Sequence, residues 1–234
     1  MKIPGAVVIV TGGSRGLGRA FSVELLKRGA RVCVADINET EGRQTEAELQ
    51  RQYGADKAFF VKCDVTKEDD TKDLWRVAVE RFTTVDLMVN NAGIMNETLV
   101  EETVQINLMG AMRGSMLAFE HMRRDRGGKG GVIINVASTA GLFPVFFMPT
   151  YVASKYALVG FTRSWAPPQY RVVFVVEPVP GEVWCELGGP VPRLRRHEHA
   201  VCGPGRPRPS PRYLPRKQGA GYRNSQDNRH QQRG

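Results

Sequence analysis

Short apolar runs alternate with longer amphipathic segments through the first three quarters of the chain. The apolar runs are rich in β-branched side chains, as expected of strands buried on both faces of a sheet. The predicted strands lie in the segments 7–10, 31–36, 58–65, 86–93, 131–138 and 172–176. The fourth of these segments is a strand that runs into a turn of small residues at 91–93. The predicted helices are 19–29, 39–53, 67–82 with Thr66 as its cap, and 101–123. This alternation predicts an α/β fold with a doubly wound, Rossmann-like parallel sheet of six strands and no seventh.

A glycine-rich turn follows the first predicted strand directly. Residues 11–18 have the pattern T-G-x-x-x-G-x-G and lead into a helix. The first N–H groups of a helix lack partners within it and lie at the positive end of its dipole, so a diphosphate can bind there. Gly12, Gly16 and Gly18 would keep that approach free of side chains. The alternative interpretation is a tight turn between strand and helix that binds nothing.

A carboxylate ends the second predicted strand, about 20 residues beyond the glycine turn. Asp36 can accept hydrogen bonds from both hydroxyls of an adenine ribose, and it would repel a 2′-phosphate. We therefore expect NAD as the cofactor rather than NADP. Arg15 favours the opposite choice if it pairs with a phosphate, although an exposed arginine in a turn is commonly solvated.

Other polar side chains lie at the carboxyl ends of the predicted strands. Asp64, Asn91 and Ser138 take these positions, as Gly12 and Asp36 do. The carboxyl ends of parallel strands meet at one edge of the sheet, where ligands of doubly wound folds bind. The sequence therefore predicts one crevice that contains all five residues, with Asp64 beside the adenine.

Tyr151 and Lys155 are four residues apart in a predicted helix and so lie on the same helix face. A phenol has a pKa of about 10, and a nearby cation stabilises the phenolate and lowers that value. A general base that works near neutral pH then becomes available. Y-x-x-x-K is also common on surface helices, and Ser138 alone is often only a cap at a strand end.

Taken together, these motifs resemble those of the short-chain dehydrogenases/reductases. The resemblance covers residues 5 to about 165 and rests on 11–18, Asp36, Asp64, Val65, N-N-A-G at 90–93, Asn107, Ser138, Tyr151 and Lys155. It implies oxidation of a secondary alcohol, with Tyr151 as the base. Lys155 would lower the pKa of Tyr151 and hold the nicotinamide ribose, Ser138 would orient the substrate oxygen, and Asn107 would support a water-mediated proton path.

The resemblance also implies a cofactor site and a homodimer. The expected NAD-binding residues are Gly12, Ser14, Arg15, Gly16, Leu17, Gly18, Asp36, Ile37, Cys63, Asp64, Val65, Asn91, Ala92, Gly93, Tyr151, Lys155 and Val183. Two protomers would pair through the helices at 101–123 and 151–165.

An apolar segment, residues 142–148, immediately precedes the helix of Tyr151. If it lines the pocket, it favours a lipophilic alcohol such as an oxygenated fatty acid or a prostaglandin. Met148 stands where close relatives carry a glutamine that contacts substrate, and we expect it to bind substrate with Ser138. Alternatively, these side chains belong to the core or to a dimer contact.

The net charge of +9 comes from the end of the chain. Residues 187–234 hold 11 Lys or Arg against Glu198 and Asp227, whereas the remainder has 22 basic and 22 acidic residues. We expect a dehydrogenase domain at 1–186 and a disordered basic tail at 187–234, whose composition cannot bury enough apolar surface to fold. A solvated tail is favoured over one that binds nucleic acid or acidic membrane by charge. His197 and His199 lack a third ligand, so no metal site is expected.

The location and the state of activity follow from smaller features. The absence of a signal segment and of a long apolar run predicts a cytoplasmic protein. Cys33 and Cys63 lie in predicted strands, as expected of buried thiols in a reducing compartment.

The tandem prolines Pro167 and Pro168 should end the helix of Tyr151 early. Because the usual continuation after 187 is missing, the alternative function is an impaired isoform that retains only NAD binding or dimerisation.

Overall fold

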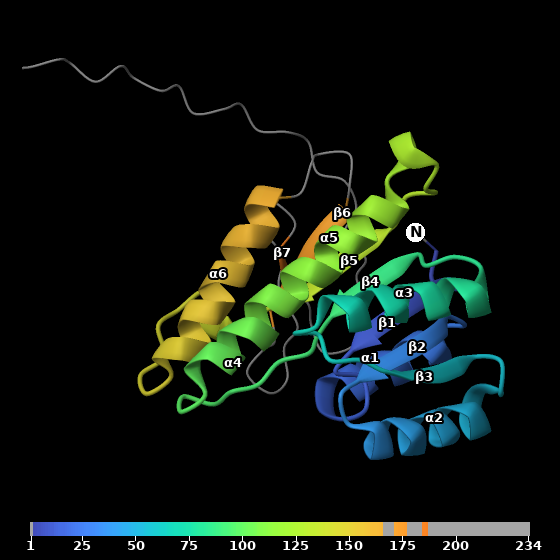
Figure 1. Ribbon diagram of the computed structural model, residues 1–234, viewed down its shortest axis with the longest axis horizontal. Helices are drawn as coiled ribbons and strands as arrows, with labels where there is room; N and C mark the ends of the chain where they lie inside the picture. The colour runs from blue at the N-terminus through green and yellow to red at the C-terminus, as the bar shows by residue number, and fades with distance from the viewer. Residues whose placement is uncertain (1, 166–170, 177–183, 187–234) are drawn as a thin grey trace, which may run out of the picture. The chain divides into compact units, whose positions relative to one another are not determined.

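The computed structural model describes residues 2–165, 171–176 and 184–186, and a mostly parallel sheet organises them (Figure 1). The strand order is β3-β2-β1-β4-β5-β6-β7. The strands are β1 (Val7–Thr11), β2 (Arg31–Asp36), β3 (Ala58–Lys62), β4 (Leu87–Asn90), β5 (Val132–Val136), β6 (Arg171–Val176) and β7 (Trp184–Glu186). The first six pair in parallel, and the chain progresses outward in opposite directions from β1 and β4. The doubly wound parallel fold predicted from the sequence is therefore confirmed.

The number of strands differs from the expected six. β7 pairs antiparallel with β6, in a register that places Val176 opposite Trp184 and Phe174 opposite Glu186. An edge strand leaves a row of backbone N–H and C=O groups without partners, and β7 supplies partners to β6. Three residues are too few to show a hydrophobic period, so the sequence analysis missed this strand.

Helices connect the strands, and most begin and end near their predicted positions. They are α1 (Gly16–Lys27), α2 (Glu39–Tyr53), α3 (Glu68–Phe82), α4 (Val100–Val104), α5 (Ala111–Met122) and α6 (Pro149–Trp165). Thr66 is not the cap of α3, because Lys67 holds that position without a side-chain bond. Thr66 instead donates from its N–H and its hydroxyl to Asp64 Oδ1, at 3.0 and 2.7 Å. α6 extends to Trp165, and the tandem prolines after it lie outside the described residues.

The single helix predicted at 101–123 is interrupted. A π-helical segment, Gln105–Gly110, separates α4 from α5. A π turn contains one residue more than an α turn, and here it brings Asn107 into the interior with 1% of its surface exposed. There the amide of Asn107 bonds both the N–H and the carbonyl of Ile94, each at 2.8 Å. Hydrophobic periodicity cannot distinguish a continuous α-helix from one that contains a single such segment.

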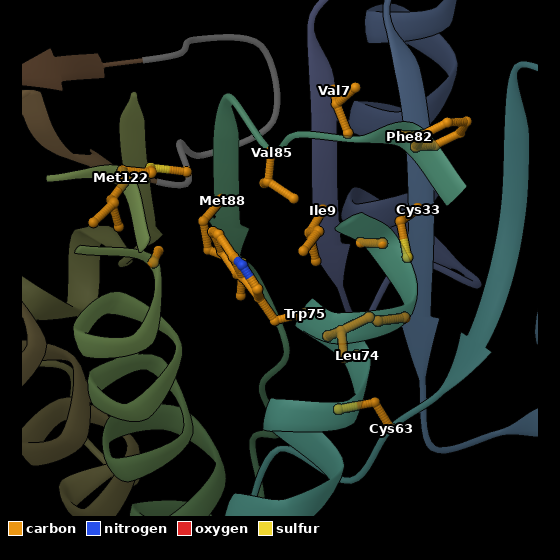
Figure 2. Packing of buried hydrophobic residues seen from close by; sticks show 14 of the residues in the cluster. Val7, Ile9, Cys33, Cys63, Leu74, Trp75, Phe82, Val85, Met88 and Met122 are labelled. Atoms are coloured by element: carbon orange, nitrogen blue, oxygen red, sulfur yellow. The ribbon is translucent and has the colours of Figure 1, made fainter. Parts of the chain in front are cut away.

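The apolar core lies on both faces of the sheet. Residues 7–10 of β1 are all fully buried, and their side chains alternate between the two faces. Val7 and Ile9 pack in one cluster with Trp75 of α3 and Met122 of α5 (Figure 2). The second and fourth pack in another cluster with Leu26 of α1 and Leu49 of α2. Burial on both faces explains why β1 is a continuous apolar run.

A buried polar network crosses the sheet next to this core. Asn90 Nδ2 donates to Asn135 Oδ1 at 2.8 Å and to Ser115 Oγ at 3.0 Å, and Ser115 Oγ donates to Asn135 Oδ1 at 2.9 Å. Asn135 Nδ2 donates in turn to Thr162 Oγ1 at 2.9 Å. The network joins β4, α5, β5 and α6, and because its members are buried, breaking one bond leaves polar atoms without partners.

Several expectations lie outside the described residues. These are the tail at 187–234 with its domain boundary, the histidines at 197 and 199, and Val183. Within the described part of the chain, no helix is long and apolar enough to cross a membrane. The same part contains no group of three metal-ligating side chains.

We expect Gly114→Ala to destabilise the protein by about 1–3 kcal/mol. A Cβ at Gly114 would collide with Asn90 Oδ1 and lie 3.0 Å from Met88 Cε, which disturbs the buried network. Gly160→Ala is the matched control, because a Cβ at that helical position meets no atom within 4 Å. The control should stabilise the protein by up to about 1 kcal/mol through helix propensity. Denaturant unfolding measures both changes, and equal stability of the two variants would contradict the packing argument.

Candidate active site

A cleft of about 360 Å³ lies at the carboxyl ends of the central strands. β1 and β4 are neighbours there, and their connections leave in opposite directions, the position where doubly wound sheets bind ligands. The predicted cofactor residues that line the cleft are Gly12, Arg15, Gly16, Leu17, Gly18, Asp36, Ile37, Cys63, Asp64, Val65, Asn91, Ala92, Gly93, Tyr151 and Lys155. The structure thus brings together residues that are up to about 140 positions apart in the sequence.

Of the predicted site residues that the structure describes, four do not line this cleft. Ser14 is buried with 3% of its surface exposed, and its N–H donates to Asp36 Oδ2 at 3.1 Å. Ser138 lies two residues after β5 and caps the short 3₁₀ turn Thr139–Gly141, where its hydroxyl accepts from the N–H of Ala140 at 3.2 Å. Asn107 and Met148 are also absent from the lining. The N–H of Ser14 thus orients the carboxylate of Asp36, while its buried hydroxyl has no hydrogen-bond partner within the described residues.

The sequence analysis missed four residues that line the cleft: Ile94, Met95, Ile106 and Val136. Ile94 and Met95 directly follow the N-N-A-G turn, Ile106 precedes Asn107, and Val136 ends β5. Each is adjacent to a position that carries chemistry. That adjacency is the signal by which they could have been found, since apolar type alone does not separate pocket residues from core residues.

The glycine turn is bound to the turn that follows β4. Thr11 Oγ1 accepts from the N–H groups of Asn91 and Ala92 at 3.0 and 3.1 Å. The side-chain amide of Asn91 donates back to the carbonyls of Thr11 and Gly12, also at 3.0 and 3.1 Å. Gly12 has a φ of +62°, a conformation that side-chain-bearing residues rarely adopt. These bonds fix the two walls of the cleft relative to each other.

The first turn of α1 fits a bound diphosphate. Arg15 precedes the helix but makes no side-chain hydrogen bond to its N–H groups. Gly16 lies beside open space, because a Cβ there meets no atom within 4 Å. A Cβ at Gly18 would instead collide with the carbonyl of Gly12, so this glycine allows close packing of α1 on the turn. The N–H groups at the start of α1 are thus not capped by a side chain, as anion binding requires.

Asp36 is held at the end of β2 by two backbone groups. Its Oδ2 accepts from the N–H of Ser14 and its Oδ1 from the N–H of Asn38, both at 3.1 Å. A carboxylate has about four acceptor sites, so each oxygen can still accept a further hydrogen bond. The carboxylate is therefore oriented within the cleft wall and retains the capacity to bind two hydroxyls.

Tyr151 and Lys155 enter the same cleft from α6. Lys155 has only 4% of its surface exposed, and its Nζ donates to the carbonyl of Val136 at 2.8 Å. Nζ also lies 5.6 Å from the centroid of the Tyr151 ring. The spacing of four residues places the two groups together, as expected. The structure thus places a phenol, an ammonium and the glycine turn around one cavity.

Comparison with known proteins decides the family. The family model described as short chain dehydrogenase matches residues 6–191. The chain belongs to the short-chain dehydrogenase family. The family was expected from the motifs of the glycine turn, Asp36, Tyr151 and Lys155, and this expectation is confirmed.

Several short-chain dehydrogenases are similar in sequence. The 15-hydroxyprostaglandin dehydrogenase [NAD(+)] of Homo sapiens is 45% identical over 166 residues, which cover 71% of this chain and 62% of the relative. The chain thus spans less than two thirds of that relative's length. An L-fucose dehydrogenase of Oryctolagus cuniculus is 33% identical over 219 residues, which cover 87% of this chain and 74% of the relative.

Solved short-chain dehydrogenases share the fold. A short chain dehydrogenase/reductase from Burkholderia phymatum in complex with NAD aligns with a TM-score of 0.68 at 26% identity, covering 75% of this chain and 66% of that one. A short chain dehydrogenase from Mycobacterium smegmatis aligns with a TM-score of 0.64 at 28% identity, covering 70% of each chain.

We expect the thiols of Cys33 and Cys63 to resist alkylation in this short-chain dehydrogenase. Burial raises the pKa of Cys33 well above its ordinary value. Burial, and then the nearby carboxylates of Asp70 and Asp64, raise the pKa of Cys63 to about 12. Both thiols are therefore protonated and unreactive near pH 8. Mass spectrometry after iodoacetamide treatment should find both unmodified in the folded protein and modified after denaturation. Rapid labelling of Cys63 before denaturation would show that the cleft is open to it.

Proposed function

We propose that this short-chain dehydrogenase uses NAD to oxidise the secondary alcohol of a lipophilic substrate to a ketone. The observation that carries the proposal is the shared cleft of the glycine turn, Asp36, Tyr151 and Lys155. A dinucleotide site and a group able to move a proton next to it are the two requirements of alcohol oxidation. Each alone is a weak signal, and their common location supports the assignment.

The chain's own residues provide binding and proton transfer. The open first turn of α1 would hold the diphosphate of NAD, the carboxylate of Asp36 would accept from the adenine ribose hydroxyls, and Asp64 would contact the adenine. NAD, when bound, supplies the chemistry of hydride acceptance. Tyr151, as a phenolate stabilised by the ammonium of Lys155, takes the hydroxyl proton of the substrate and becomes a neutral phenol.

Two further residues have roles that the family resemblance implies. Ser138, two residues after β5, would donate to the substrate oxygen and orient it for the transfer of its proton to Tyr151. Asn107 supports a path of water molecules that carries the proton onward. Asn107 is suited to this role because its side chain is buried and fixed by the backbone of Ile94.

The proposed substrate is a 15-hydroxyprostaglandin or a related hydroxylated fatty acid. Support comes from the similarity to enzymes named for that activity and from the segment before α6. In that segment Phe143, Phe146 and Phe147 have 66%, 81% and 81% of their surface exposed. These aromatic side chains lie outside the lining of the cleft, but they precede Tyr151 closely in the sequence, and exposed apolar surface of this kind would suit an aliphatic substrate. Half-buried Met148 belongs to the same segment and adds apolar surface.

The alternative function is NAD binding or dimerisation without turnover. The observation that favours it is the 62% of the prostaglandin relative's length that the similarity covers.

For either function we further propose a cytoplasmic homodimer whose protomers pair through α5 and α6. Met116 of α5 is exposed and available for such a contact.

We expect Tyr151→Phe to reduce the turnover number for NAD reduction by about 10²–10⁴-fold, because it removes the proton acceptor. The dissociation constant of NAD, measured by calorimetry, should change by less than about threefold, because the phenylalanine ring keeps the packing. Tyr156→Phe is the matched control: it removes an exposed phenol one turn along the helix and should retain full activity.

The outcome of this experiment separates the two functions. Turnover of a 15-hydroxyprostaglandin by the unaltered protein, lost in Tyr151→Phe, supports the dehydrogenase. NAD binding without turnover of any secondary alcohol supports the alternative. Full turnover by Tyr151→Phe would exclude Tyr151 as the base.

We expect Asp36→Asn to weaken the preference for NAD over NADP. The substitution removes the negative charge that repels a 2′-phosphate, while the remaining amide oxygen keeps one backbone hydrogen bond. The ratio of kcat/KM for NAD to kcat/KM for NADP should fall at least about tenfold. Glu39→Gln, a neighbouring carboxylate paired with Lys62 at 3.4 Å, should leave the ratio unchanged. An unchanged ratio in Asp36→Asn would place the ribose elsewhere.

A further inference from the structure

The first turn of α6 has a charged partner that the reaction scheme does not use. α6 begins at Pro149, and its first N–H groups have no partners within the helix. Glu97 provides the acceptors for two of these N–H groups. Its Oε2 accepts from the N–H of Thr150 at 2.9 Å, and its Oε1 accepts from the N–H of Tyr151 at 3.0 Å. One carboxylate thus holds the backbone of the proposed base and of the residue before it.

Glu97 lies in a loop that is itself fixed. The loop starts at Ile94, which is bound through its N–H and its carbonyl to the amide of Asn107. The carbonyl of Asn96, next to Glu97, accepts from the hydroxyl of Thr103 at 2.8 Å. The carboxylate of Glu97 is therefore presented to α6 from a loop attached to both α4 and the π-helical segment.

A second contact closes a ring of hydrogen bonds around Tyr151. Ser154 Oγ donates to the carbonyl of Tyr151 at 2.7 Å and accepts from Asn107 Nδ2 at 3.2 Å. The N–H of Tyr151 is held by Glu97 and its carbonyl by Ser154, and both contacts lead back to Asn107. The backbone of Tyr151 is thus fixed on both sides by groups outside the regular bonding of the helix.

The charge state of Glu97 suits this role. The N–H of Tyr151, and after it the N–H and side chain of Thr150, lower the pKa of the Glu97 carboxyl. The carboxylate is therefore ionised near neutral pH. A charged acceptor forms stronger hydrogen bonds than a neutral one, and a negative charge at the start of a helix is favourable.

We infer that Glu97 is a positioning residue that fixes the backbone of Tyr151 and so places its phenol for proton transfer. The kinetic part of this inference rests on the proposed function. Glu97 does not line the cleft, so its effect is on the placement of the base and not on the surface that binds NAD. Misplacement of a reacting group by about 1 Å can reduce a rate about a hundredfold.

The kinetic test compares Glu97→Ala, Glu97→Gln and the control Glu102→Gln. Glu102 is an exposed carboxylate five residues further on, with no hydrogen bond or ion pair to any described residue. Glu97→Ala should lower kcat about 10–100-fold while the dissociation constant of NAD changes less than about twofold. The kcat of Glu97→Gln should lie between that of Glu97→Ala and that of the unaltered protein, because the amide oxygen of glutamine can keep one of the two hydrogen bonds. Glu102→Gln should have the same kcat and the same dissociation constant of NAD as the unaltered protein.

Two results would overturn the inference: an unchanged kcat in Glu97→Ala, or a loss of NAD affinity as large as the loss of kcat. The second result would mean general damage to the domain. Amide hydrogen exchange provides a readout that needs no turnover. The N–H groups of Thr150 and Tyr151 should exchange at least about tenfold faster in Glu97→Ala than in Glu102→Gln. If the unaltered protein is inactive but these rates differ, the proposed function fails and the positioning by Glu97 stands; equal rates refute the positioning.

Discussion

The reciprocal bonding between the turns after β1 and β4 is the constraint on which the cleft depends. Thr11 binds the backbone of Asn91 and Ala92, and the amide of Asn91 binds the backbone of Thr11 and Gly12. Adjacent parallel strands alone would set the separation of these turns but not their conformation. The four bonds satisfy polar groups at a sheet edge that must remain open to a ligand, so the edge stays ordered without apolar cover.

Much of the fold and cleft could be predicted because both depend on simple periodic rules. A strand buried on both faces must be apolar throughout, and parallel strands must be joined by helices. Once the strands are in place, their carboxyl ends form one edge, and Asp36, Asp64 and Asn91 are brought together by topology alone. The i, i+4 spacing of Tyr151 and Lys155 is likewise a local property of a helix. No distant contact had to be known for these predictions.

The parts that could not be predicted depend on contacts between side chains and distant backbone. The π-helical segment around Asn107 is stabilised by the backbone of Ile94, whose position is set by the loop after β4. Ser14 has its N–H bound to Asp36, and its carbonyl accepts from Thr45 Oγ1 at 2.7 Å, two contacts that no local pattern indicates. Glu97 shows no pattern in the sequence that distinguishes it from other surface carboxylates. Such pairings are visible only when the coordinates of both partners are known.

The position of α6 is set by polar contacts more than by apolar ones. Apolar packing tolerates small rotations and shifts of a helix, because dispersion contacts are not directional. The buried polar side chains of α6 have directional partners at three levels: Ser154 with Asn107, Lys155 with the carbonyl of Val136, and Thr162 with Asn135. A rotation or a shift of one residue would break all three and leave buried polar atoms unsatisfied. The register of this helix, and with it the place of Tyr151, is therefore specified by groups that contribute little apolar burial.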